Sequence, residues 1–592
     1  MEFLKSFKSD SDFFSNATNL PSKNVSYTRL EGNVWFDIQR KIYKTNCLTF
    51  TAVSGGSGPG PSPEPEVSKS TKSGLSKSSS DTSYITIYTS GSTSKNIEYS
   101  FDNGASWKKL NLSSSGGRDI PLRGGSVSSD GTITLKKGES VSFRGVNDNL
   151  CGQNQEFHFS TSGTFKVSGD ATSLLNGVGG DVDLTDRPYC FYRLFNECDI
   201  ITPPRLPSTK LSVGCYKEMF SYCQSLTTPP ELPATTLAIR CYNEMFKGCS
   251  FTTPPELPAT TMEEGCYREM FYGCGITTPP ELPATTLAVS CYESMFMYCN
   301  SLTAAPQLPA TDLEGSCYQS MFYGCGITTP PELPATNLAM NCYYGMFQYC
   351  SNLTSAPQLP AMTLANSCYS NMFQDCSGLT IAPVLPATTI ADYCYSNMFA
   401  GCTSLTNPPE LPAMTLANSC YSNMFAGCTS LTTAPEIPAT TLASYCCNYM
   451  FSGCSALTTA PNLSATTLSP YCYRYMFYNC RSLTTVQQRL PATTLVNSCY
   501  QGMFYGCSAL TTAPELPAQT LVQYCYNYMF TNCSNLSWVK ALFTTQPSIG
   551  YTRDWMLNVR YSGTFVKHTD AIWTTIAVYA VPGGWYVERA SE

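Results

Sequence analysis

Apolar residues occur in pairs at every fourth position through the middle of the chain. One example runs from Leu416 to Cys428, where the apolar positions are Leu416, Ala417, Cys420, Tyr421, Met424, Phe425 and Cys428. Pairs of apolar residues at this spacing predict an amphipathic helix with a wide buried stripe. Thr415 is placed to cap the start of that helix, and Gly427 to end it in a left-handed turn.

The segment that follows Cys428 carries Pro435 and Pro438 and has no helical pattern. Proline removes a backbone donor and restricts the residue before it, so this segment cannot continue a helix. We predict a short strand followed by an extended return.

This arrangement of helix, strand and return recurs fourteen times between about residues 185 and 537. The first cysteine of each unit lies at positions 190, 215, 241, 266, 291, 317, 342, 368, 394, 420, 446, 472, 499 and 525, so successive units are 25, 26 or, once, 27 residues apart. A short fixed period predicts a solenoid, because each unit is too small to bury its own apolar face and depends on its neighbours.

The core of the unit, residues 424–431 in the same example, has the pattern Met-Phe-x-Gly-Cys-x-x-Leu. This pattern resembles the repeat of BspA-like leucine-rich repeat proteins. The resemblance implies an α/β fold, a leucine-rich-repeat solenoid of about fourteen coils with short parallel strands on one face and helices on the other. Tandem prolines, such as Pro229 and Pro230, and the Cys-Tyr that precedes Met-Phe depart from that family.

The flanking segments differ from the repeats in composition. Residues 1–53 have mixed patterning and are interpreted as a small N-terminal anchoring module, and residues 54–80 are rich in Ser, Gly and Pro, which is typical of a flexible linker. Over 81–168, apolar and polar residues alternate, as expected for a small antiparallel β-sandwich. Residues 169–537 are assigned to the solenoid with its N-terminal cap, and 538–592 to a C-terminal cap.

Within the expected sandwich, five residues have the spacing of an Asp-box: Ser100, Asp102, Gly104, Ser106 and Trp107. This resemblance implies a β-hairpin turn, as in sialidases and other carbohydrate-associated proteins, with Asp102 bonded to turn amides and Trp107 packed beneath. A single copy, without an arginine cluster and a catalytic tyrosine, does not indicate an enzyme.

Of the 31 cysteines, 28 form fourteen Cys-x7-Cys pairs, and Cys47, Cys151 and Cys447 remain. A helix would place the members of a pair about 12 Å apart, beyond the roughly 7 Å that a disulfide allows. We favour a buried ladder of reduced thiols, because free cysteine packs as a small hydrophobe. Disulfides between equivalent cysteines of neighbouring units are an alternative. Zinc is a minor one, since the spacing is unusual and only His158 and His568 are present.

Composition disfavours several other function classes. The net charge is −7 with 13% charged residues, which offers no basic surface for nucleic acid. No run of about 18 to 20 apolar residues predicts a membrane span, and the first residues lack a secretory signal, so the chain is expected to be made in the cytoplasm. Neither a nucleophile elbow nor a phosphate-binding loop occurs, so no enzyme activity, cofactor or metal is predicted.

Two columns of side chains are candidate recognition surfaces. The first consists of tyrosines one before and three after the first cysteine: Tyr445, Tyr449, Tyr471, Tyr475, Tyr524 and Tyr528. A ring with a polar tip suits sugars and proteins, although these tyrosines could equally fill gaps between adjacent helices. The second consists of glutamates before Leu-Pro or Ile-Pro: Glu231, Glu256, Glu281, Glu332, Glu410, Glu436 and Glu515. Their like charges would repel unless water, cations or a ligand relieve them, or unless each glutamate bonds its own turn.

The C-terminal segments 563–567 and 582–588, with the repeat, resemble repeat proteins of gut Bacteroidetes and their phages. This resemblance implies a non-enzymatic virion fibre of a phage tail or head. Its N-terminal module would bind other virion proteins, and its solenoid would contact a host-cell surface glycan or protein. The alternative is a secreted bacterial adhesin that binds host proteins or glycans from the cell surface, and a glycan-processing accessory protein is a third hypothesis. A homo-oligomer is compatible with each.

Overall fold

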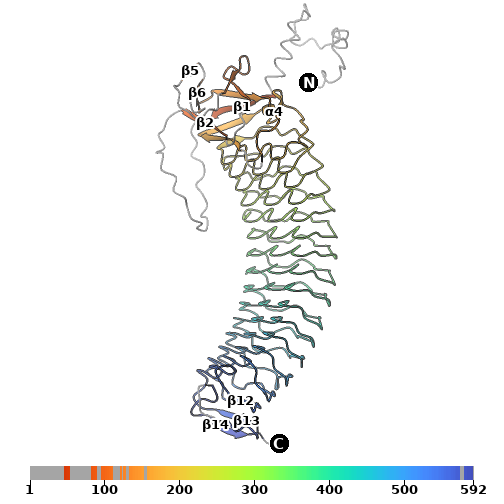
Figure 1. The fold of residues 1–592 in the computed structure, drawn as a ribbon, viewed down its shortest axis with the longest axis vertical. Helices are drawn as coiled ribbons and strands as arrows, with labels where there is room; N and C mark the ends of the chain where they lie inside the picture. The colour runs from red at the N-terminus through yellow and green to blue at the C-terminus, as the bar shows by residue number, and fades with distance from the viewer. Residues whose placement is uncertain are drawn as a thin grey trace, which may run out of the picture. The chain divides into compact units, whose positions relative to one another are not determined.

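The structure is a computed structural model that describes residues 46–53, 82–89, 95–110, 120–122, 125–127, 132–152, 156–573 and 579–590. The expected linker at 54–80 and most of the expected module at 1–53 lie outside these residues. The described residues from Cys47 onward form one compact unit by their contacts. In Figure 1 the repeats follow one another in chain order between the N-terminal sheets and the last three strands. Among the residues described, no helix has both the length and the apolar character that a membrane span needs.

Two sheets make up the N-terminal part. One has the strand order β11-β10-β1-β8-β3-β4, and the other β5-β6-β7-β2-β9. The strands are β1 (Leu48–Val53), β2 (Thr82–Thr89), β3 (Ile97–Ser100), β4 (Lys108–Lys109), β5 (Ile120–Leu122), β6 (Gly125–Val127), β7 (Ile133–Lys136), β8 (Ser140–Gly145), β9 (Phe157–Ser162), β10 (Thr164–Ser168) and β11 (Ile200–Thr202). The ring of Phe159 in the second sheet lies 4.9 Å from Phe50 and 5.3 Å from Phe143 in the first, so the sheets share one core.

The position of β1 corrects a predicted boundary. The sequence predicts a module over 1–53 and a sandwich that begins at residue 81. Instead, β1 pairs antiparallel with both β8 and β10, so it is an inner strand of the sandwich. Its side chains alternate between buried and partly buried, the same two-residue period that marks the later strands.

The repeats contain no α-helix, so the predicted amphipathic helices, and the α/β class that depends on them, are wrong. The backbone runs instead as overlapping turns. In the unit of Cys420, the amide of Ser422 donates to the carbonyl of Ser419 at 3.2 Å, and the amide of Tyr421 donates to Cys446 of the next unit at 2.9 Å. Successive amides alternate in this way between the two kinds of bond. We call the residues from one before the first cysteine to the second cysteine the turn ribbon of a unit.

Every fourth residue of a turn ribbon has a left-handed backbone. In the unit of Cys420 these residues are Ser419, Asn423 and Gly427, with φ of 51°, 53° and 75°. An α-helix excludes this backbone, because the left-handed conformation costs an L-residue about 1–2 kcal/mol and breaks the ladder of bonds four residues apart. The ribbon recovers the lost bonds by pairing half of its amides with the next unit.

Two neighbouring residues test this backbone directly. Ser367 has φ of 54°, whereas Asn366 beside it is not left-handed. We expect Ser367→Gly to raise the free energy of unfolding by about 1 kcal/mol, because glycine adopts positive φ without strain. We expect Asn366→Gly to lower it by about 0.5–1 kcal/mol through chain entropy alone. Urea unfolding followed by circular dichroism measures both, and equal losses would indicate a helix instead of a ribbon.

The interior of the repeats is built from columns of identical side chains. Successive phenylalanines stack with ring centroids 5.4–5.9 Å apart and planes within 11°. A second column contains buried tyrosines, such as Tyr369, and is interrupted by Cys447. The second cysteine of most units donates its thiol to the phenylalanine carbonyl of the preceding unit, as Cys376 does to Phe347 at 2.9 Å. All 31 cysteines are buried and free, which confirms their predicted burial.

The sandwich covers the first unit. β10 pairs in parallel with β11, which belongs to that unit. The ring of Phe159 stacks on Phe195 at 5.6 Å, and its amide donates to the carbonyl of Leu194 at 2.9 Å. The short helix α4 (Ser173–Asn176) lies between β10 and the first unit in sequence. The β-sandwich therefore fills part of the capping role that the sequence assigns to residues after 168.

Three parallel strands follow the last unit: β12 (Trp538–Ala541), β13 (Thr564–Lys567) and β14 (Tyr586–Arg589). The ring of Trp555 is fully buried, lies 6.2 Å from the last phenylalanine of the column, Phe530, and donates from Nε1 to the carbonyl of Ala580 at 2.6 Å. This tryptophan ends the aromatic column.

Candidate functional site

The predicted tyrosines lie on the turn ribbons of the last units. Tyr445 stacks on Tyr471 with ring centroids 4.4 Å apart, and Tyr449 stacks on Tyr475 at 4.9 Å. Each pair joins equivalent positions of adjacent units, so the unit spacing sets the ring spacing. The structure therefore brings four of the six predicted tyrosines together.

The same surface includes residues that the sequence analysis missed. Tyr478 stacks on Tyr505 at 5.0 Å and meets the edge of Tyr475 at 5.7 Å. The guanidinium of Arg474 lies 5.0 Å from the ring of Tyr475, and within 6.0 Å of two further rings. We call the following residues the tyrosine cluster: Tyr445, Tyr449, Tyr471, Tyr475, Tyr478, Tyr505 and Arg474. The sequence carried a signal for Tyr478 and Tyr505, because each stands six residues after the first cysteine of its unit and the two units are adjacent.

The other two predicted tyrosines are not part of this cluster. Tyr528 faces the guanidinium of Arg553 at 5.8 Å, and Tyr524 is 40% exposed. The repeats have no helices, so the alternative of tyrosines between adjacent helices takes another form: Tyr445 and Tyr449 pack against the equivalent tyrosines of the next turn ribbon.

All six predicted tyrosines occupy left-handed backbone positions, with φ between 51° and 60°. A bulky residue in this conformation is an outlier, and such strain persists where the side chain serves a purpose. Gly502 holds the place equivalent to Tyr475 in the next unit, and a Cβ atom there would collide with the Tyr475 ring, 2.1 Å from its Cε1. That glycine therefore makes room for the ring.

The predicted glutamate column is exposed over most of its length. Glu515 differs from the rest, because it forms ion pairs with Arg489 at 3.3 Å and Lys540 at 2.9 Å. Glu436 accepts a bond from the amide of Asn462, in the next unit, at 3.3 Å. Among the described residues, no glutamate of the column accepts a bond from its own turn. The predicted alternative of self-capped turns is therefore wrong.

The remaining members of the column are Glu231, Glu256, Glu281, Glu332 and Glu410, all exposed to solvent. Water and salt screen charges at such exposed positions. In the described parts of the chain, no group of three or more His, Cys, Asp or Glu side chains is placed to hold a metal ion.

The Asp-box residues form the predicted structural turn. Asp102 accepts bonds from the amide and the hydroxyl of Ser106 at 2.8 and 2.6 Å. Burial acts to raise the pKa of the Asp102 carboxyl, but the bonds from Ser100 and Ser106 outweigh it and hold that pKa well below its usual value. The guanidinium of Arg144 lies over the ring of Trp107, with Cζ 4.2 Å from the ring centroid.

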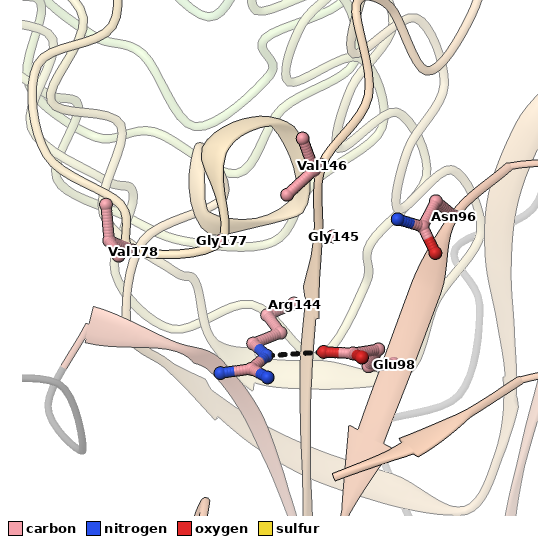
Figure 2. A pocket seen from close by; sticks show the side chains of 7 residues that line it. All are labelled: Asn96, Glu98, Arg144, Gly145, Val146, Gly177 and Val178. Carbon is pink, nitrogen blue, oxygen red and sulfur yellow. Dashed lines mark hydrogen bonds and ion pairs between the residues drawn. The ribbon is translucent and has the colours of Figure 1, made fainter.

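A shallow hollow on the sandwich adjoins this turn and is drawn in Figure 2. It is lined by Asn96, Glu98, Arg144, Gly145, Val146, Gly177 and Val178. The Nε of Arg144 donates to Glu98 at 2.6 Å, as the dashed line in Figure 2 marks. Since this pair neutralises the only two charged residues that line the hollow, the arrangement holds neither a free base nor a free cation for chemistry.

Burial disfavours the thiolate form of cysteines in the repeats. Burial raises the pKa of the Cys215 and Cys291 thiols to about 12. The thiolate is the reactive form of cysteine, and its population at neutral pH is negligible at such a pKa. These buried cysteines pack the core of the repeats.

Comparisons with known proteins bear on the family. No curated protein matches this chain. Among solved structures, a leucine-rich repeat protein from Bacteroides ovatus is similar at 17% identity over 63% of this chain and 86% of that chain, with a TM-score of 0.33. A family model described as the BspA type leucine-rich repeat region matches in six copies over residues 213–354, 264–406, 388–502 and 470–550, which together span more than half of the chain. The protein belongs to the BspA-type leucine-rich repeat family.

Proposed function

We propose that this protein is a non-enzymatic recognition protein. Its repeats form a solenoid of about fourteen coils, and the tyrosine cluster on that solenoid contacts a glycan or protein of a cell surface. The observation that supports this function best is the strain at the cluster. Four of its tyrosines hold left-handed positions where most other units place serine, asparagine or glycine, as at Ser498 and Gly502, and a few place arginine or glutamate. A chain that needed only stability would keep the small residue there.

The array that carries the cluster suits display. Stacked phenylalanines and thiols tie each unit to the next, so side chains on the ribbon are held at fixed spacing. A rigid tyrosine ring with a polar tip contributes contact area at little cost in conformational entropy. Arg474 adds a cation that is already held between the rings, where it donates to Gln501 at 3.1 Å.

We further propose that the solenoid is part of a phage virion, as a tail or head fibre whose N-terminal module attaches to other virion proteins. The buried, reduced thiols support this proposal, because they suit a chain that folds in a reducing cytoplasm. The alternative is a secreted bacterial surface adhesin, which the family membership favours. An antibody against the repeats should label purified phage particles under the first proposal and intact uninfected bacteria under the second.

Substitution of the cluster tests the recognition function. We expect Tyr471→Ser combined with Tyr475→Ser to reduce attachment of the full chain to target cells about tenfold or more, because each lost ring removes roughly 1 kcal/mol or more of contact energy. Serine already stands at the equivalent places Ser498 and Ser320. Flow cytometry with the labelled full chain measures attachment.

A matched control is Tyr561→Ser, at an 86% exposed tyrosine outside the cluster. This control should attach like the unchanged protein. Equal attachment by the folded cluster variant and the unchanged protein would refute a role for the cluster.

A further inference from the structure

A second row of tyrosines crosses the first half of the repeats. Tyr272, Tyr298, Tyr323 and Tyr349 come from four successive units, with ring centroids 5.5, 5.3 and 5.1 Å apart. They occupy the sixth and seventh places after the first cysteine in alternate units. We call these four residues the tyrosine ridge. None of them is among the residues that the sequence predicted for recognition.

Ring orientation separates the ridge from the tyrosine cluster. In the cluster, partner rings such as Tyr445 and Tyr471 are parallel, with planes 4° apart, so they cover each other's faces. In the ridge, the planes of successive rings differ by 82°, 84° and 59°. In an edge-to-face row, each contact places the edge of one ring against the face of its neighbour. Tyr298 and Tyr349 are 38% and 46% exposed.

The exposed rings of the ridge are held at a cost in backbone strain. Tyr298 and Tyr349 have φ of 61° and 62°. The units next to them place glycine at the same position, at Gly273 and Gly324. The Tyr298 ring lies against Gly324, where a Cβ atom would be 2.9 Å from its Cδ1. Glycine fits this position without strain, so retention of tyrosine indicates that the ring itself is used.

The charged side chains near the ridge lie toward its two ends: Arg268 and Glu293 form an ion pair between the ribbons of Tyr272 and Tyr298, and Asp375 follows Tyr349 in the next unit. At its N-terminal end Lys247 lies 4.6 Å from the Tyr272 ring, but this lysine forms ion pairs with Glu244 and Glu269, both at 2.9 Å. Further along, the turn ribbons of residues 316–325 and 341–350 contain no charged side chain. A charged ligand would gain little from this uncharged middle of the ridge, whereas a ligand with apolar faces and hydroxyl groups finds both kinds of partner.

We propose that the tyrosine ridge binds a neutral glycan chain laid along successive units. The proposal rests on the proposed recognition function and names the chemistry of one ligand. Pyranose rings have an apolar C–H face that packs on an aromatic ring, and their hydroxyls exchange hydrogen bonds with phenol groups. One tyrosine per unit, at a spacing of 5.1–5.5 Å, matches a polymer that repeats one sugar at a time.

The test uses the full chain on an array of neutral glycans, followed by titration calorimetry with the best-bound hexasaccharide. We expect Tyr298→Gly combined with Tyr349→Gly to weaken binding about tenfold or more. This variant should be at least as stable to heat as the unchanged protein, because neighbouring units already carry glycine there. Tyr298→Phe combined with Tyr349→Phe keeps the ring faces and should retain binding within about threefold.

Three results would overturn the proposal: no neutral glycan binds, the glycine variant binds as well as the unchanged chain, or the phenylalanine variant loses as much as the glycine variant. Failure of the ridge remains distinguishable from failure of the recognition function. If cell attachment survives periodate treatment of the target cells and is lost after protease treatment, the ligand is a protein, and the recognition function stands without the glycan.

Discussion

Raising the pH from 7 to 10 is expected to unfold the repeats in a steep transition. Burial raises the native pKa of thiols such as Cys215, Cys291 and Cys533 to about 12, whereas an unfolded thiol titrates near a pKa of about 8.5. The folded state therefore holds its protons more tightly than the unfolded state. The buried thiols contribute their full stabilisation below about pH 8.5, and this contribution to the free energy of unfolding falls as the pH rises above that value.

The size of this effect follows from the number of thiols. Each buried thiol lowers the free energy of unfolding by about 1.4 kcal/mol for each pH unit above the pKa that the thiol has in the unfolded chain. Burial raises the pKa of many of the paired cysteines, among them Cys190, Cys223 and Cys507, so the effect is many times that of one thiol if the repeats unfold together. Buried tyrosines such as Tyr242 act in the same direction above about pH 10, because burial also raises their pKa.

Far-ultraviolet circular dichroism between pH 7 and pH 10, in the presence of reductant, measures this transition. Replacement of both cysteines of one unit, Cys368→Ala with Cys376→Ala, supplies the control, because it should make the pH dependence shallower by about two protons. An unchanged spectrum at pH 10 would contradict this prediction.

Truncation of one ring in the middle of the aromatic column should destabilise the array strongly. Phe373 is fully buried, and its ring stacks between Phe347 and Phe399 at 5.6 and 5.7 Å. We expect Phe373→Ala to cost about 3–5 kcal/mol, through lost burial and the cavity that remains. Because each unit contacts only its neighbours, the defect also divides the array into two blocks.

Urea unfolding of the full chain measures this loss, and a second transition should become visible as the two blocks unfold separately. Tyr393→Ala is the matched control, since this residue stands in the next ribbon but is 50% exposed. It should change stability by less than about 1 kcal/mol. A loss of similar size in both variants would contradict the column as the source of stability.

Much of the architecture was predictable because burial follows the repeat pattern. Positions equivalent to Cys420, Met424, Phe425 and Leu431 are apolar in nearly every unit, and each of these four is fully buried. The period alone implies contact between equivalent residues of adjacent units. The antiparallel strands of the sandwich follow from their two-residue alternation, and only β1 was assigned to the wrong part, because residues 54–80 separate it from its partners in sequence.

The helices were predicted wrongly because a turn ribbon and a helix share nearly the same apolar pattern. A helix has 3.6 residues per turn, so a strict spacing of four drifts around its surface. Cys420, Met424 and Cys428 keep that strict spacing and are all fully buried. The distinguishing signal was the residue before each pair, often Ser, Asn or Gly, which tolerate left-handed backbone better than most residues.

The candidate site was partly predictable for a related reason. Tyr445, Tyr449, Tyr471 and Tyr475 were identified because they recur at fixed positions in adjacent units. The tyrosine ridge was not predicted, because its tyrosines alternate between the sixth and seventh places after the first cysteine. Neither of these two places carries tyrosine in every unit of the ridge. The amide of Tyr298 donates to the carbonyl of Tyr323 at 2.8 Å, and this bond between ribbons places the two rings 5.3 Å apart.

The backbone hydrogen bonds that join one turn ribbon to the next all point the same way. The amide of each unit donates to the carbonyl of the unit after it, from Tyr189 and Val213 at the start to Tyr524 and Gly550 at the end. Aligned peptide dipoles add along such a column, as they do along a helix. Here the positive end lies at the C-terminal unit, the reverse of an α-helix. The two ends of the array are thus electrically unlike, which favours an acidic neighbour at the C-terminal end and disfavours contact between two like ends.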